Sequence, residues 1–208
     1  MKKTLIIALV FVLLMVGATM MYNRLLKTAA PDQLTVHQSP AQEPQEAADA
    51  LDETQTESEA EAETDPPKVA APDFTVYFLD GKEVRLSDYI GKPIVVNFWA
   101  SWCGPCQIEM PDFQAKYEEI GDDVQFLMVN MTDGSRETTE IASSFIEKKG
   151  YTFPVFYDTA IDAAMKYGVY SLPTTYFIDK EGYAIAQATG AIDGDTLQRG
   201  IEMIVPQK

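Results

Sequence analysis

Two cysteines, Cys103 and Cys106, have the spacing of a reversible disulfide, and they are the only cysteines in the chain. They follow an apolar run, Pro93 to Trp99, whose β-branched and aromatic residues predict a central strand covered on both faces. A helix-like segment begins near Gly104. At a helix start, the dipole and the free backbone N–H groups favour a thiolate, which is the nucleophile in disulfide exchange. The pattern therefore predicts a redox site.

A zinc site is the first alternative for a pair of cysteines. A closed zinc site needs four ligands, and both cysteines belong to a single pair. The only histidine, His37, lies in an acidic stretch of low complexity. We therefore expect no metal and no cofactor, the redox group being the Cys103–Cys106 pair itself.

The chain resembles the thioredoxin superfamily over the run Asn97-Phe98-Trp99-Ala100-Ser101-Trp102-Cys103-Gly104-Pro105-Cys106. The following Glu109-Met110-Pro111 resembles the membrane-anchored TlpA/ResA-like branch, and the resemblance covers about residues 68 to 204. It implies an α/β, thioredoxin-like fold with a central mixed β-sheet flanked by helices. An N-terminal β-hairpin and an extra helix-strand insertion are also expected.

The two thiols are expected to have unequal roles. Cys103 is expected to be the exposed nucleophile that attacks a substrate disulfide. Cys106, one helical turn inward, then breaks the mixed disulfide and releases the reduced substrate. By resemblance, Pro173 is the cis-proline that lies against the cysteine pair, and the Leu172 backbone pairs with a substrate peptide. The predicted substrate-binding residues are Trp102, Gly104, Pro105, Leu172 and Pro173.

Glu109 is the third predicted catalytic residue. It follows Cys106 by three positions and therefore shares one face of the helix with it. The resemblance implies that a glutamate here influences proton transfer at the cysteines, while the alternative is a solvated glutamate on a polar face. Asn97 stands where cytosolic thioredoxin has an aspartate that helps to deprotonate the resolving cysteine. Because asparagine does not titrate, that task would pass to Glu109 or to water.

The implied function is a protein-disulfide reductase, a thiol:disulfide oxidoreductase acting on exported proteins such as apocytochrome c before haem attachment. Gly104-Pro105 adds no charge to stabilise the thiolate, whereas a histidine there would make the protein oxidising. The expected partners are an exported disulfide-containing protein and a membrane thiol-transfer electron donor. We expect a monomer.

Two alternatives use the same fold. A thioredoxin-fold peroxidase needs a threonine three residues before its reactive cysteine, and this chain has Ala100 there. A copper chaperone module would need a third ligand such as histidine near Pro173, and the sequence has none. Both alternatives are therefore disfavoured.

An N-terminal apolar stretch of eighteen uncharged residues, Leu5 to Tyr22, predicts a membrane anchor over residues 1–28. A cleaved signal peptide is the alternative, but the run from Gly17 to Arg24 fits an A-x-A cleavage site poorly. We expect a single-pass protein of the cell membrane with its catalytic domain extracytoplasmic.

Residues 29–67 are predicted to be an acidic disordered linker. From Pro31 to Pro67 there are eleven acidic residues and no lysine or arginine. Such a segment buries too little apolar surface to offset the entropy of ordering. With a net charge of -16, the chain also has no basic patch for nucleic acid, so no such partner is expected.

Residues 68–208 are predicted to be the thioredoxin-like domain that positions the site. Turn residues and hydrophobic periods divide it into elements. The expected strands are Phe74–Leu79 with Glu83–Leu86, Pro93–Trp99, Val124–Met131, Phe153–Phe156, and Thr174–Ile178 with Tyr183–Thr189. The expected helices are Gly104–Ile120, Glu137–Lys149, Ala160–Tyr167 and Asp193–Ile204.

Overall fold

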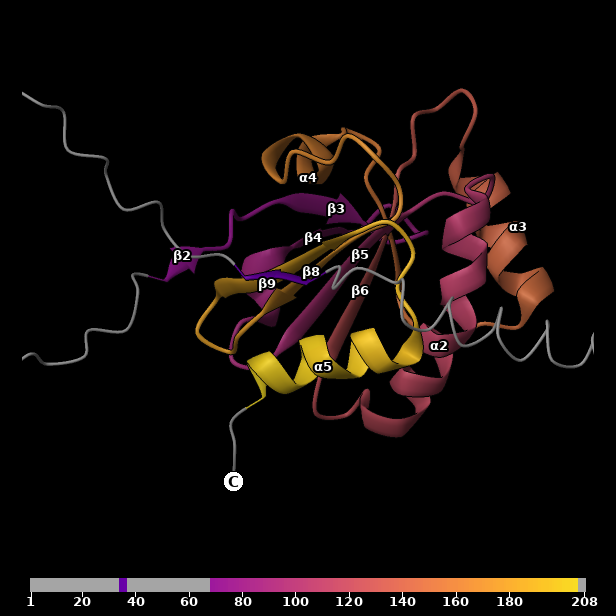
Figure 1. Cartoon of the computed structure of the whole chain (residues 1–208). Coiled ribbons are helices and arrows are strands. Elements are labelled where there is room, and N and C mark those ends of the chain that lie inside the picture. Colours follow the sequence, from indigo (N-terminus) through magenta and orange to yellow (C-terminus); the bar gives the residue numbers. More distant parts are fainter. Residues whose placement is uncertain (1–33, 37–67, 206–208) are drawn as a thin grey trace, which may run out of the picture. The chain divides into compact units, whose positions relative to one another are not determined.

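The computed structural model describes residues 34–36 and 68–205, which form an α/β unit (Figure 1). The predicted anchor, residues 1–28, lies outside the described residues, as does most of the predicted linker. None of the helices within the described ranges has the length and hydrophobicity needed to cross a membrane.

Within the described residues, a mixed sheet of nine strands forms the centre of the fold. The strand order is β1-β9-β8-β5-β6-β7-β3-β4, and β2 also pairs with β9. Strands β5, β6 and β7 run parallel to one another, and the other pairings are antiparallel. The strand bounds are β1 Leu34–Val36, β2 Val69–Ala70, β3 Thr75–Tyr77, β4 Glu83–Arg85, β5 Ile94–Trp99, β6 Gln125–Asn130, β7 Val155–Tyr157, β8 Thr174–Ile178 and β9 Tyr183–Thr189.

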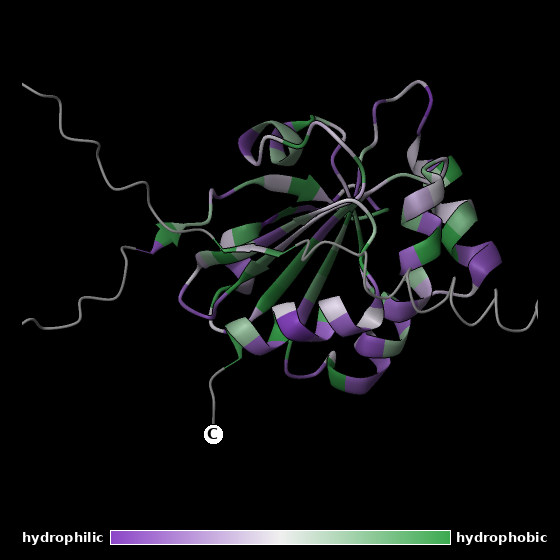
Figure 2. Cartoon of the chain, viewed as in Figure 1, coloured by the Kyte–Doolittle hydropathy of each residue, from purple (hydrophilic) through white to green (hydrophobic). Residues whose placement is uncertain are grey.

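The central strand β5 is buried along its whole length, as the apolar run predicts. Its residues alternate between two core clusters, because successive side chains of a strand point to opposite faces. Val95 and Trp99 join the cluster that includes residues of α2 (Gly104–Ile120), α3 (Thr139–Lys149) and α5 (Gly194–Ile204). Val96 and Phe98 join the cluster that includes residues of α4 (Asp162–Lys166). The buried strands appear as green bands between helices of mixed colour in Figure 2.

Most of the predicted elements are confirmed. The N-terminal hairpin is β3–β4, the insertion is α3 with β7, and the closing hairpin is β8–β9. Helix α5 begins after Asp193, whose side chain caps it by accepting a hydrogen bond from the Thr196 N–H at 2.9 Å. Helix α4 is shorter than predicted because Ile161, in the left-handed region at φ 56°, precedes it. A 3-10 turn, η1, covers Leu86–Tyr89.

The strand β1 differs from the prediction of a disordered linker over residues 29–67. Leu34–Val36 pairs antiparallel with Ala186–Ala188 of β9, and β2 pairs further along the same strand. Leu-Thr-Val has β propensity, and the unpaired backbone groups of an edge strand accept such a segment. Charge and composition do not reveal this pairing, because the partner lies about 150 residues away in the sequence.

Candidate active site

The two cysteines form a disulfide at the start of α2. Cys103 is the N-cap residue of the helix, and its Sγ accepts a hydrogen bond from the Cys106 N–H at 3.2 Å. Gly104 and Pro105 form the first turn. The N-terminal sulfur thus faces the free N–H groups of the helix, which is the environment that lowers a thiol pKa.

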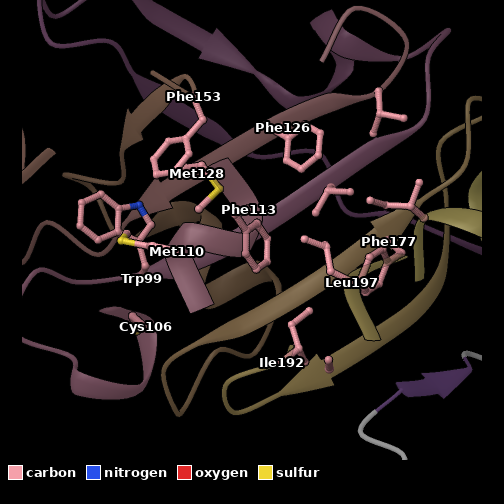
Figure 3. Close-up of a cluster of buried hydrophobic side chains, with 14 of the residues drawn as sticks. Trp99, Cys106, Met110, Phe113, Phe126, Met128, Phe153, Phe177, Ile192 and Leu197 are labelled. Carbon is pink, nitrogen blue, oxygen red and sulfur yellow. The ribbon is translucent and has the colours of Figure 1, made fainter. Parts of the chain in front are cut away.

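Both cysteines are buried, although only Cys106 is expected from the sequence to be shielded from solvent. Cys103 is 4% exposed and Cys106 is fully buried. The prediction that Cys103 is exposed is therefore wrong for the disulfide form, in which this residue is buried. Figure 3 shows Cys106 with the buried cluster that includes Trp99, Met110 and Ile192.

A groove of about 570 Å³ provides the approach to the disulfide, and Cys103 lines it whereas Cys106 does not. Of the predicted substrate-binding residues, it brings together Trp102, Gly104, Pro105 and Leu172. The peptide bond between Leu172 and Pro173 is cis, as the resemblance implies. The remaining lining residues are Met131, Asp133, Arg136, Ile161, Val169, Tyr170 and Ser171.

Apolar side chains lie exposed around this groove. Tyr170 is 98% exposed and Trp102 is 41% exposed, with the Arg136 guanidinium 3.7 Å from the centre of the Trp102 ring. The sequence prediction included Trp102 but missed Tyr170 and Arg136. Tyr170 is three residues before the predicted cis-proline, and this short separation could have indicated that it lies near the site. No local feature of the sequence connects Arg136 with Trp102.

Glu109 is buried, so the alternative of a solvated glutamate is wrong. It is 1% exposed and lies one turn of α2 beyond Cys106. Its Oε1 accepts a hydrogen bond from Asn97 Nδ2 at 2.8 Å, and its Oε2 accepts one from the Ile192 N–H at 3.0 Å. Burial raises the pKa of Glu109 to about 7, and the two hydrogen bonds oppose that rise. A carboxyl group with this pKa can both accept and return a proton near neutral pH.

Asn97 lies in the middle of β5 and holds Glu109 in place. Its Nδ2 also donates to Thr175 Oγ1 on the neighbouring β8 at 3.0 Å. The side chain is fully buried. Asn97 therefore supplies a donor to the carboxylate without competing for the proton.

The described site offers a redox-active disulfide, a buried acid and an apolar groove. Among the residues that the structure describes, no three His, Cys, Asp or Glu side chains group as a metal site requires. The chemistry available to these residues is dithiol–disulfide exchange assisted by proton transfer.

The comparisons with known proteins agree with this geometry. The model of the AhpC/TSA family matches residues 67–186. The thiol-disulfide oxidoreductase ResA of Geobacillus thermodenitrificans is 37% identical over 139 residues, covering 65% of this chain and 76% of that protein. The protein of the same name from Oceanobacillus iheyensis is 38% identical over 146 residues, covering 67% and 73%.

Solved structures share the fold. A putative thiol:disulfide interchange protein DsbE from Chlorobium tepidum is 33% identical, with a TM-score of 0.56, over 65% of this chain and 94% of that chain. The exposed lipoprotein thioredoxin of Streptococcus pneumoniae is 37% identical, with a TM-score of 0.54, over 63% and 98%.

Proposed function

Because the chain belongs to the AhpC/TSA family and is a thiol-disulfide oxidoreductase of thioredoxin fold, we propose that it reduces disulfides of exported proteins outside the cell membrane. One observation carries the proposal most directly. The Cys103–Cys106 disulfide lies at the N-terminus of α2, and only Cys103 lines the apolar groove beside the cis-proline. A substrate disulfide entering the groove would meet Cys103 first.

The exchange proceeds in two balanced steps. In the reduced protein, the Cys103 thiolate attacks one sulfur of the substrate disulfide, and the other substrate sulfur leaves as a thiolate that takes up a proton. The Cys106 thiol then gives its proton to the Glu109 carboxylate and attacks the Cys103 sulfur. The bond between Cys103 and the substrate breaks, and the departing substrate thiolate takes up the proton held by Glu109. The substrate is thereby released as a dithiol, and Cys103 and Cys106 are left as a disulfide. A membrane thiol-transfer partner supplies two electrons and two protons to restore the dithiol.

Protein substrates suit the groove better than small disulfides. The exposed rings of Trp102 and Tyr170 provide apolar contact in the groove that Cys103 lines, and the groove includes Leu172, the residue before the cis-proline. An exported protein such as apocytochrome c, whose cysteines must be reduced before haem attachment, meets this requirement. No observation favours the peroxidase, because Ala100 has no hydroxyl group, or the copper chaperone, because no histidine lies near Pro173.

The direction of the reaction is tested by the reduction potential. We expect a value closer to about -270 mV, typical of thioredoxin, than to the about -120 mV of a strong oxidase, because Gly104-Pro105 adds no charge to stabilise the thiolate. Equilibration of the chain with dithiothreitol buffers of defined ratio, followed by alkylation and mass spectrometry, gives this value. A potential near that of the oxidase would contradict the proposed direction.

The location is tested by topology. We expect residues 5–22 to remain attached and to hold the domain outside the cell, because this stretch is apolar and uncharged. Fractionation should place the full chain in the membrane, and protease added to intact cells should remove residues 68–208. A cytoplasmic marker protein that survives the protease serves as the control. Release of a soluble protein lacking residues 1–28 would rule out the anchor, and protection of the domain would rule out the orientation.

A further inference from the structure

A second buried acid, Glu137, lies in the connection between β6 and α3. It is fully buried, although residues 133–136 before it are exposed. A carboxylate removed from water needs hydrogen-bond partners, since its desolvation is otherwise costly. The identity of those partners therefore indicates what Glu137 supports.

Two of the three hydrogen bonds to the Glu137 carboxylate come from Ser101, two residues before Cys103. The Ser101 N–H donates to Oε1 at 2.7 Å, and the Ser101 hydroxyl donates to Oε2 at 2.6 Å. Asn130 Nδ2, at the end of β6, also donates to Oε1 at 2.7 Å. The carboxylate therefore joins the end of β6 to the loop that leads into α2.

The same loop is held from its other side. The Ser101 carbonyl accepts a hydrogen bond from Gln107 Nε2 of α2 at 2.6 Å. The next residue, Trp102, lies under the Arg136 guanidinium. The backbone N–H, carbonyl and side chain of Ser101 are thus all engaged, and Glu137 provides two of these contacts.

Glu137 is itself fixed by its own turn. Its N–H donates to Asp133 Oδ1 at 3.0 Å, and its carbonyl accepts from the Gly134 N–H at 2.9 Å. Gly134 adopts φ 73°, which glycine allows without strain. The carboxylate is therefore presented to Ser101 by a turn that is closed by its own hydrogen bonds.

We propose that Glu137 is a positioning residue that keeps Cys103 aligned with the N-terminus of α2 after the disulfide has opened. In the oxidised protein, the bond to Cys106 itself holds the Cys103 sulfur. Reduction removes that constraint, and the backbone of residues 101–103 must then hold the thiolate against the helix N–H groups. Glu137 acts through Ser101 to provide this support. The inference rests on the proposed exchange at Cys103 and names a residue on which that exchange depends.

The test compares Cys106→Ser with the double variant Cys106→Ser, Glu137→Gln in the full chain, so that a single thiol is measured. The amide of glutamine would place a donor against the donors of Ser101 and Asn130. We expect the pH midpoint of Cys103 alkylation by iodoacetamide to rise by about one unit, which is the effect of losing one charge-assisted or helix-end interaction. Attack on a small aromatic disulfide below that midpoint should slow about threefold, because the roughly tenfold loss of thiolate is partly offset by its higher nucleophilicity.

Asp179→Asn in the same background is the matched control for a general loss of stability. Asp179 is also a buried carboxylate that accepts backbone hydrogen bonds, from Glu181 and Tyr183, but it lies just after the end of β8 that pairs with Ile94 at the start of β5. The Asp179→Asn substitution should lower the melting temperature and leave the pH midpoint of Cys103 alkylation unchanged. Ser101→Ala, which removes only the hydroxyl contact, should shift the midpoint in the same direction as Glu137→Gln but by less.

Three outcomes would overturn the inference. The first is an alkylation midpoint equal to that of the Cys106→Ser parent in both Glu137→Gln and Ser101→Ala, at a temperature where they are folded. The second is an equal shift in Asp179→Asn. Either of these removes only the role of Glu137. The third is a Cys106→Ser parent that does not react with disulfides, in which case the proposed exchange fails along with the inference. If Glu137→Gln fails to fold, Ser101→Ala alone decides between the first outcome and the proposal.

Discussion

Replacing Cys103 by serine is expected to reduce disulfide exchange to the uncatalysed background. Cys103 is the cysteine that lines the groove, and its sulfur faces the N-terminus of α2, whereas Cys106 is fully buried beneath it. A serine hydroxyl at this position is not ionised near neutral pH and does not attack a disulfide. Reduction of a model disulfide protein, with dithiothreitol as the electron source, measures the loss.

The same substitution at Cys106 is the matched control, because it lies three residues away in the same helix turn. Cys106→Ser should retain the first attack through Cys103 but should lack turnover, since no second thiol breaks the mixed disulfide. Retention of turnover by Cys103→Ser would mean that Cys106 reaches substrates directly, and the assignment of roles would be reversed.

Replacing Glu109 by glutamine has the second largest expected effect. The carboxyl group is buried one turn beyond Cys106, and its pKa of about 7 lets it accept a proton near neutral pH, as the proposed release step requires. Loss of a positioned general base lowers a rate by about 10²-fold or more, so turnover should fall by that order while the fold is retained. The alkylation profile of the reduced variant should also lose any dependence on a group titrating near pH 7. Profiles that superimpose on wild type would exclude Glu109 from the chemistry.

The same substitution has a consequence for stability that is independent of activity. Glu109 has a folded-state pKa of about 7, raised from 4.5, so the folded oxidised protein retains a proton that the unfolded chain has lost. The contribution of Glu109 to the free energy of unfolding is therefore fully present below about pH 4.5. It is lost as the pH rises through about 7, and the loss is on the order of 3 kcal/mol. Urea unfolding of the oxidised chain at pH 4.5 and pH 8 should show a smaller loss in Glu109→Gln than in wild type. Asp158, whose pKa is also raised by burial, remains in both proteins and cancels in the comparison.

Those parts of the site that depend on local sequence could be predicted. The cysteines, the glycine-proline pair and the helix start lie within a few residues of one another, so their geometry follows from one turn of backbone. The apolar run that forms β5 predicts a strand buried on both faces, and its residues do enter both core clusters. The cis-proline follows from resemblance to a family motif rather than from any local physical signal.

Parts that depend on distant contacts could not be predicted. The position of Glu109 on a helix fits both a solvated and a buried side chain, and the deciding contact comes from Ile192, 83 residues away. The burial of Glu137 could not be predicted from its exposed, polar segment, because its partner Ser101 lies 36 residues earlier, in the loop before α2. The strand β1 likewise depends on pairing with β9, so composition alone classified it as linker.

Exchange through Cys103 as the outer nucleophile and Cys106 as the inner resolving thiol is tested most directly by trapping a mixed disulfide. Full-length Cys103→Ser and Cys106→Ser are incubated with a model disulfide protein and, separately, with a membrane extract, and are then resolved by non-reducing electrophoresis. We expect Cys106→Ser alone to accumulate a covalent complex, which dithiothreitol separates by reducing the mixed disulfide. Equal trapping by both variants, or trapping by neither, would contradict this exchange mechanism.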